Sequence, residues 1–135
     1  MAVRYWNGRS ILRFDDVITI YNKIVNDDET VEWKRTVVNG VQWSDDFEKE
    51  NMSGKISIAK YVKITFPIGT YEGLTLNPSN EEDAIVYGEV TDEVTEIKGH
   101  RISDLLNKYA KSGRIKTVND NSNRRFLPNI KVVIG

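Results

Sequence analysis

Carboxylates are the residues of this sequence whose types and spacing come nearest to a chemical site. They occur in four short runs: Asp15-Asp16, Asp27-Asp28, Asp45-Asp46 and Glu81-Glu82-Asp83. Paired carboxylates can share a proton or bind a hard cation. However, every run lies at an expected turn, and none has the alternating ligand spacing of a calcium loop. We therefore interpret these acids as solvated turn residues, and a carboxylate-dependent enzyme is the weakest of three hypotheses.

The one histidine, His100, follows Gly99 and has no serine or cysteine nucleophile motif near it. Nucleophilic and zinc sites need further matched groups, and the sequence contains no cysteine. It also contains no phosphate-binding motif of the GxxxxGK[ST] or GxGxxG type. The sequence thus predicts no catalytic residue, no metal ligand and no cofactor.

Charge is distributed unevenly along the sequence. Residues 1–14 carry 3 bases and no acid (+3), residues 15–97 carry 7 bases and 18 acids (−11), and residues 98–135 carry 9 bases and 2 acids (+7), which returns the net charge of −1. Such asymmetry is typical of an interaction surface. The candidate basic face consists of Lys98, Arg101, Lys108, Lys111, Arg114, Lys116, Arg124 and Arg125.

Two kinds of partner fit this basic face. A nucleic acid would place phosphates against it, but the C-terminal third offers only Tyr109 and Phe126 as aromatic residues for base stacking. An acidic face of a neighbouring protein would complement the same charges. A small nucleic-acid-binding barrel is therefore the second hypothesis, behind a protein–protein role.

Length and composition predict one globular domain. The chain has 135 residues, of which 39% are hydrophobic and 29% charged, close to globular averages. No apolar run reaches the roughly 18 residues that span a bilayer, and the N-terminus lacks the apolar region of a secretory signal. We expect cytoplasmic synthesis, a domain over residues 15–135, and an N-terminal arm over residues 1–14. Arg4 and Trp6 in this arm are candidate partner contacts.

Two early segments predict strands joined by a tight turn. Residues 17–21 are short and rich in β-branched side chains, and residues 31–37 alternate between apolar and polar positions. Asn39-Gly40 then lies between Val38 and Val41, and two residues that tolerate positive φ predict a type I′ hairpin.

The longest strand is expected over residues 55–67. Its alternate positions are apolar and should face the core: Ile56, Ile58, Val62, Ile64 and Phe66. Further strands are expected over residues 84–90, 93–97, 114–118 and 130–134.

Two long connections complete the pattern. Residues 44–54 are polar and end in glycine, which predicts an exposed loop. Residues 67–82 form a connection longer than compact domains usually contain without a functional reason. We interpret it as an arm that contacts a partner or a channel, through Tyr71, Leu74 and Leu76.

One short helix is expected near residues 103–112, with Ser103 as N-cap, Asp104 in the first turn and Gly113 closing the end. The fold class is therefore all-β, at the margin of α+β. A small barrel or sandwich of about six or seven strands with long loops is favoured over alternating β-α-β units.

Several stretches resemble a known protein family. They are DVITIYNK at 16–23, WKRTVVNGVQW at 33–43, AIVYGEV at 84–90, KTVNDN at 116–121 and FLPNIKV at 126–132. Their order resembles uncharacterised small structural proteins of siphophages and prophages of Gram-positive bacteria, encoded near the head–tail connector genes. The resemblance covers residues 16–133, and its motifs are structural rather than chemical.

The resemblance implies a role in virion morphogenesis, by analogy with head-closure or stopper proteins. Those proteins form a ring beneath the portal and adaptor, and they are small barrels whose long loops reach into the DNA channel. The expected partners are therefore portal, adaptor and tail or neck proteins, with packaged DNA nearby and no membrane. The chain would form a homo-oligomeric ring in the virion neck and a monomer or weak oligomer alone. A tail-completion protein and a minor capsid protein remain alternatives.

Overall fold

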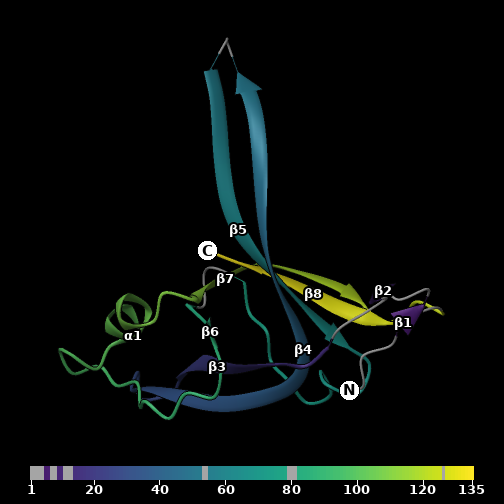
Figure 1. Cartoon of the computed structure of the whole chain (residues 1–135). Helices are drawn as coiled ribbons and strands as arrows, with labels where there is room; N and C mark the ends of the chain where they lie inside the picture. The colour runs from purple at the N-terminus through teal and green to yellow at the C-terminus, as the bar shows by residue number, and fades with distance from the viewer. Residues whose placement is uncertain (1–4, 7–8, 11–13, 53–54, 79–81, 126) are drawn as a thin grey trace.

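The computed structural model describes residues 5–6, 9–10, 14–52, 55–78, 82–125 and 127–135, and it describes the side chains of residues 14–45, 61–78, 82–125 and 127–135 (Figure 1). Its elements are β1 (Tyr5–Trp6), β2 (Arg9–Ser10), β3 (Asp16–Val25), β4 (Val31–Met52), β5 (Lys55–Pro67), β6 (Ala84–Tyr87), α1 (Ile102–Lys108), β7 (Ser112–Asn121) and β8 (Asn129–Ile134). The described chain is mostly β with this one short helix, so the predicted all-β fold class is confirmed.

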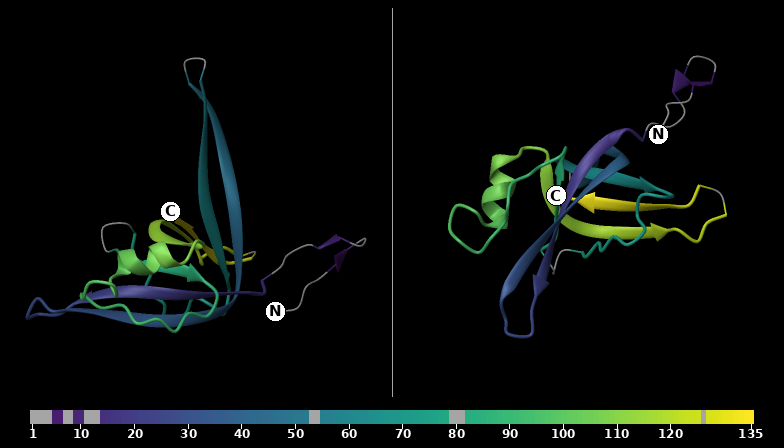
Figure 2. Two further views of the ribbon diagram at one scale, coloured as in Figure 1. Left: turned by 60° about the vertical axis from the view of Figure 1, so that its left-hand side comes forward. Right: turned by 90° about the horizontal axis from the view of Figure 1, so that it is seen from below.

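Six of the described strands close an antiparallel barrel in the order β3-β4-β5-β8-β7-β6, and β6 pairs back with β3 to complete the ring. β1 and β2 form a separate two-stranded sheet, which lies away from the barrel in both views of Figure 2. Closure removes the free strand edges that an open sheet would expose.

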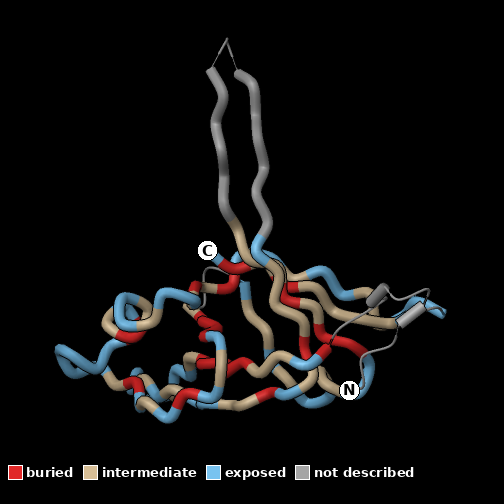
Figure 3. Tube along the Cα trace, viewed as in Figure 1, coloured by how far each residue is buried: buried red, intermediate tan, exposed pale blue. Residues whose placement is uncertain are grey.

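The barrel encloses the larger core. Alternate residues of the strands point inward and are buried, as the period of a β-strand requires, and Figure 3 shows them in red along the barrel. The buried members are Ile18, Ile20, Val38, Val41, Ile64, Phe66, Ile85, Ile115, Val132 and Ile134. The prediction for Ile64 and Phe66 is confirmed, Val62 packs against this core from a partly buried position, and the side chains of Ile56 and Ile58 lie outside the described residues.

A second core lies on the outer face of β3 and β6, beneath α1. It consists of Tyr21, Ala84, Val86, Val90, Val94, Ile102 and Leu105. Both faces of β3 are therefore covered, which explains why residues 17–21 read as a continuous β-branched run. Trp33 packs against this second core and Trp43 against the first.

The hairpin predicted at Asn39-Gly40 is wrong, because β4 runs straight through it. Val17 pairs with Asn39 and Asp16 pairs with Val41, so Gly40 is an extra residue in the ladder. Its φ of +82° identifies a β-bulge built on glycine. At this bulge β4 leaves β3 and begins to pair with β5 at Gln42.

The loop predicted over residues 44–54 is also wrong, since β4 continues to Met52 and pairs with β5 in unbroken register as far as Lys55. The strand expected over residues 93–97 does not form, and β6 instead pairs with β3 and β7. The chain reversal between β3 and β4 lies at residues 26–30, where Asn26 N–H donates to Thr30 O at 2.9 Å.

The helix begins one residue earlier than expected and ends sooner. Arg101, not Ser103, is its N-cap, and the backbone N–H of Arg101 donates to the Asp104 carboxylate at 3.1 Å. Asp104 occupies the first turn, as predicted, and Lys108 occupies the last turn. Gly113 does not close the helix, because it is buried within β7.

Candidate functional site

Residues 46–52 of β4 and 55–61 of β5 form a two-stranded ribbon outside the barrel, and we call residues 46–61 the arm. From the pair Asp46 and Tyr61 to the pair Met52 and Lys55, β4 and β5 are bordered by no other strand of the described chain. Figures 1 and 2 show this ribbon projecting well beyond the barrel. Isolated two-stranded ribbons are marginally stable in water, and their outer edges offer unpaired backbone groups. The arm is therefore the element that most needs a partner.

The base of the arm is fixed by a small polar and aromatic cluster. The carboxylate of Asp16 accepts hydrogen bonds from the Trp43 backbone N–H at 2.9 Å and from the Tyr87 hydroxyl at 3.1 Å. The hydrogen bond to Asp16 raises the pKa of Tyr87. The Trp43 and Tyr87 rings meet edge to face with centroids 5.2 Å apart, and the Lys111 ammonium lies 4.7 Å from the centroid of the Tyr87 ring. These contacts tie the start of β3, the bulged part of β4 and the end of β6 together where the arm begins.

The described part of the expected loop, residues 67–78, does not project, contrary to expectation. The candidate contacts Tyr71, Leu74 and Leu76 are partly buried and pack against the barrel core. The Asn22 side-chain amide donates to Thr75 O at 2.7 Å, which holds the middle of the loop on β3. The long chain segment therefore covers the core, and the arm takes the protruding position that was assigned to this loop.

Asp83 anchors the far end of that loop. Its side chain is fully buried, and its two oxygens accept hydrogen bonds from Lys23 N at 2.8 Å, Asn22 Nδ2 at 2.8 Å and Asn77 Nδ2 at 2.9 Å. A buried carboxylate is tolerated only when such donors compensate its lost hydration. Interpreting Asp83 as a solvated turn residue was therefore wrong. Its neighbour Glu82 pairs with the Lys23 ammonium, and this hydrogen bond lowers the pKa of Glu82.

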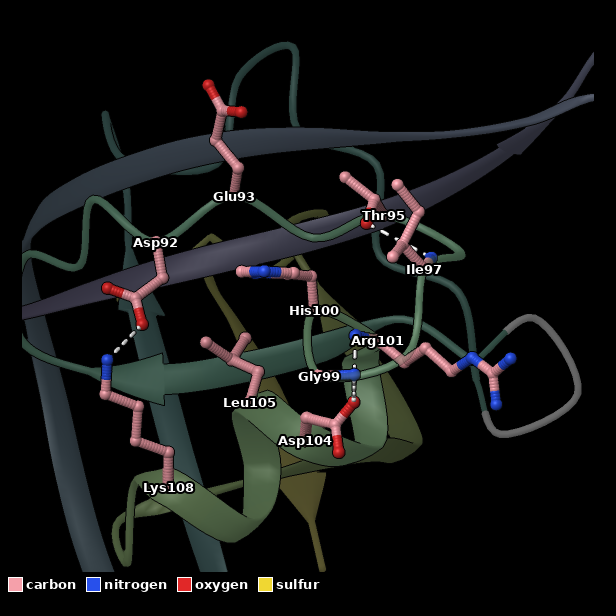
Figure 4. A pocket seen from close by; sticks show the side chains of 10 residues that line it. All are labelled: Asp92, Glu93, Thr95, Ile97, Gly99, His100, Arg101, Asp104, Leu105 and Lys108. Carbon is pink, nitrogen blue, oxygen red and sulfur yellow. Dashed lines mark hydrogen bonds and ion pairs between the residues drawn. The ribbon is translucent and has the colours of Figure 1, made fainter.

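A hollow of about 520 Å³ lies between residues 92–100 and α1 (Figure 4). The Asp92 carboxylate there binds the Lys108 ammonium at 2.7 Å and accepts the Tyr109 hydroxyl at 3.1 Å. The hydrogen bond with Lys108 lowers the pKa of Asp92, and it raises the pKa of Lys108. One oxygen of Asp104 accepts the backbone N–H groups of Gly99 and Arg101.

Figure 4 shows His100 extending toward Asp92 and Leu105, and the labelled residues include no serine and no cysteine. The carboxylates of Asp92 and Asp104 already serve the packing of the loop on the helix. This arrangement favours a structural role for the hollow.

The candidate basic face is not gathered at one place. Lys108 lies in the last turn of α1, Arg101 is its N-cap, and Lys98 is exposed in the segment that precedes it. Lys111 contacts the Tyr87 ring, Arg114 is half-buried in β7, and Lys116 is exposed on the same strand. Arg124 and Arg125 are exposed in the turn between β7 and β8, and Figure 1 places that turn on the opposite side of the barrel from α1.

The two remaining candidate partner contacts, Arg4 and Trp6, belong to the N-terminal segment. Arg4 lies outside the described residues, and Trp6 belongs to β1, whose side chains are likewise not described. Sequence reasoning missed the arm, although one signal for it existed: β5 was correctly predicted to begin at Lys55, and a strand that starts there needs a partner next to it.

Comparison with known proteins yields one match. The model of a family of unknown function (DUF6751) matches residues 13–133 of this chain. No curated protein and no solved structure matches it. Within the described ranges, no helix has the length and apolar character needed to cross a membrane. The same described residues contain no group of three or more histidine or acidic side chains placed to hold a metal ion.

Proposed function

We propose that this chain, which belongs to the family of unknown function DUF6751, is a non-catalytic virion morphogenesis protein of a tailed bacteriophage or prophage. Its place is the neck, where it forms part of a head-closure ring between the portal and adaptor on one side and the tail on the other. It is made in the cytoplasm of the bacterial host and assembles on partner proteins.

The observation that carries this proposal is the arm. Residues 46–61 form a ribbon outside the barrel whose strands pair only with each other among the described residues. A ribbon of this kind gains stability when its edges or faces meet other chains. Barrels with a long element that reaches into a central channel are also what the resemblance to neck proteins implies, and the arm supplies such an element.

The arm is also continuous with two strands of the barrel. β5 continues from the arm directly into the barrel, where Ile64 and Phe66 are fully buried. On β4, Trp43 pairs with Ile64 and is held by Asp16. Because the arm shares its strands with the core, a contact made along it is transmitted to a rigid body rather than to a free loop.

The test is an arm-shortened variant in which residues 47–60 are replaced by Asn-Gly. Asp46 and Tyr61 are directly paired, so a two-residue turn can join them without moving the barrel. The variant should melt like the wild-type chain yet fail to complement a phage that lacks the gene. Electron microscopy should then show heads that lose their DNA or lack tails.

Two outcomes contradict the proposal. Infectious particles at wild-type titre from the arm-shortened variant would remove the role of the arm. Normal particles made without any copy of the protein would remove the neck assignment. A variant with Glu72→Lys, an exposed position outside the arm and the barrel strands, should complement fully and controls for surface substitution as such.

A further inference from the structure

The turn between β3 and β4 presents apolar and acidic side chains together. Ile24 and Val25 are 40% and 62% exposed, and Asp27, Asp28 and Glu29 are exposed immediately after them. No basic residue occurs between Lys23 and Lys34. We call residues 24–29 the acidic tip.

The acidic tip is held in one conformation. Asn26 N–H donates to Thr30 O at 2.9 Å, and Glu29 N–H donates back to Asn26 O at 3.0 Å. The Asp28 carboxylate accepts the Thr30 hydroxyl at 2.6 Å. Glu29 has a φ of +66°, which an L-residue adopts only at a cost in backbone energy. A fixed tip loses little entropy when it binds.

The turn between β7 and β8 has the opposite character. Arg124 and Arg125 are exposed there, and Leu127 is 55% exposed with a φ of +50°. No acidic residue follows Asp120 in the sequence. We call residues 124, 125 and 127 the basic tip.

The basic tip is held in place in the same way. Arg124 N–H donates to Asn121 O at 3.2 Å, and the Asn129 side-chain amide donates to Leu127 O at 2.8 Å. Both tips therefore present a fixed apolar surface beside charges of one sign.

The two tips cannot meet within one chain. In Figure 1 the acidic tip lies at the left end of the barrel and the basic tip at the far right, and the view from below in Figure 2 also separates them. Two different patches that complement each other but lie apart on one subunit form a head-to-tail contact, and repetition of such a contact builds a ring when the rotation between successive copies closes.

We propose that the acidic tip of one copy docks against the basic tip of the next copy. This inference rests on the proposed ring function and names the contact between its subunits. The charges set the orientation, and the exposed side chains of Val25 and Leu127 supply the apolar contact. The contact is small and largely exposed, so salt at physiological strength screens it, and the ring forms on its template rather than in free solution.

Disulfide trapping tests the contact in purified protein. The chain has no cysteine, so one population carries Val25→Cys and a second carries Leu127→Cys. Mixing them under mild oxidation should give roughly tenfold more mixed disulfide than either population gives alone. The yield should fall as salt is raised from about 0.05 M to about 0.5 M, because the Debye length shortens.

A charge swap separates docking from chance collision. Asp27→Lys with Glu29→Lys, placed in the Val25→Cys chain, should lower the mixed disulfide roughly tenfold. Asp28 is retained because its carboxylate holds Thr30. Arg124→Glu with Arg125→Glu in the Leu127→Cys chain should then restore the yield. Glu72→Lys with Glu89→Lys makes the same change in net charge outside both tips and should leave it unchanged.

Equal yields of mixed and like-with-like disulfide, or a swap that does not restore the mixed product, would overturn this contact. Such a failure would leave the neck assignment standing, because that assignment is tested by particles and not by purified chains. Conversely, a salt-sensitive, swap-restored disulfide would stand even if particles formed normally without the protein.

Discussion

The carboxylate of Asp16 accepts a hydrogen bond from the backbone N–H of Trp43 at 2.9 Å, across the point where β4 leaves β3 and turns toward the arm. The ladder between β3 and β4 ends at the pair Asp16 and Val41, and this side-chain contact links the two strands two residues further along β4. The base of the arm is thus fixed by a residue that belongs to a neighbouring strand.

Removing this acceptor should loosen the base of the arm. Asp16→Ala leaves the Trp43 N–H and the Tyr87 hydroxyl without their partner, and we expect a loss of about 1–3 kcal/mol in the free energy of unfolding. Asp16→Asn retains one acceptor oxygen and should lose less. Urea denaturation measures both, and equal stability of Asp16→Ala and the wild-type chain would contradict the assigned role.

The glycine bulge confines the need for positive φ to one residue, Gly40. Gly40 has positive φ, but a Cβ at that position would meet Thr70 Cγ2 at 3.7 Å and Phe14 O at 3.8 Å, which are ordinary contacts. Gly40→Ala should therefore cost about 1 kcal/mol through backbone strain alone.

Asn39 supplies the matched control for the bulge. It is exposed and sits within the ladder opposite Val17, so Asn39→Ala should change stability by less than about 0.5 kcal/mol. In a type I′ turn both positions would require positive φ. Comparable losses at Asn39 and Gly40 in thermal melts would therefore favour the turn over the bulge.

Removing the buried carboxylate of Asp83 should cost more stability than removing the partly exposed carboxylate of its neighbour Glu82. Asp83→Ala leaves three N–H donors unsatisfied and frees the end of the loop over residues 67–82, so we expect a loss of about 3 kcal/mol or more. Glu82→Ala removes a partly exposed ion pair with Lys23 and should cost at most about 1 kcal/mol. Similar losses for the two variants would show that Asp83 is not the anchor.

Burial of Tyr21 makes the free energy of unfolding depend on pH in the alkaline range. Burial raises the pKa of Tyr21 from 10.0 to about 12, and the hydroxyl donates to Asp92 O at 2.6 Å. As pH rises, the unfolded chain loses this proton before the folded chain does. The contribution of Tyr21 to the free energy of unfolding is therefore fully present below about pH 10 and is lost as pH rises toward about 12. The loss should reach about 3 kcal/mol.

Urea denaturation at a series of alkaline pH values measures this loss. Tyr21→Phe removes the titrating group, so the variant should be less dependent on pH over the same window. An unchanged alkaline slope in Tyr21→Phe would assign the effect to other groups, among them Tyr87, whose pKa is also raised by its hydrogen bond to Asp16.

Strands whose side chains alternate between buried and exposed positions could be predicted from the sequence alone. Burial alternates along a strand, so β5 and its inward residues Ile64 and Phe66 could be predicted from spacing alone. The strands β7 and β8 were likewise expected, over residues 114–118 and 130–134, and they pair with each other. These elements needed no knowledge of distant contacts.

The errors arose where distant parts of the chain decide the outcome. Positive φ at Gly40 serves a bulge as well as a hairpin, and the choice depends on whether Val41 finds a partner, which it does in Asp16. The first strand of the arm is polar in sequence, so residues 44–52 resemble a loop when they are considered without their partner strand β5. Asp83 looked solvated because two of its donors, Asn22 and Lys23, come from some sixty residues earlier in the chain.

The most direct test of the central claim is the position of the protein in the particle, measured by cryo-electron microscopy of virions from a phage or prophage that encodes it. The account predicts a ring of barrels in the neck between portal and tail, with the arms of residues 46–61 reaching toward neighbouring chains or the channel. Virions that lack the protein, or that carry it away from the neck, would contradict it.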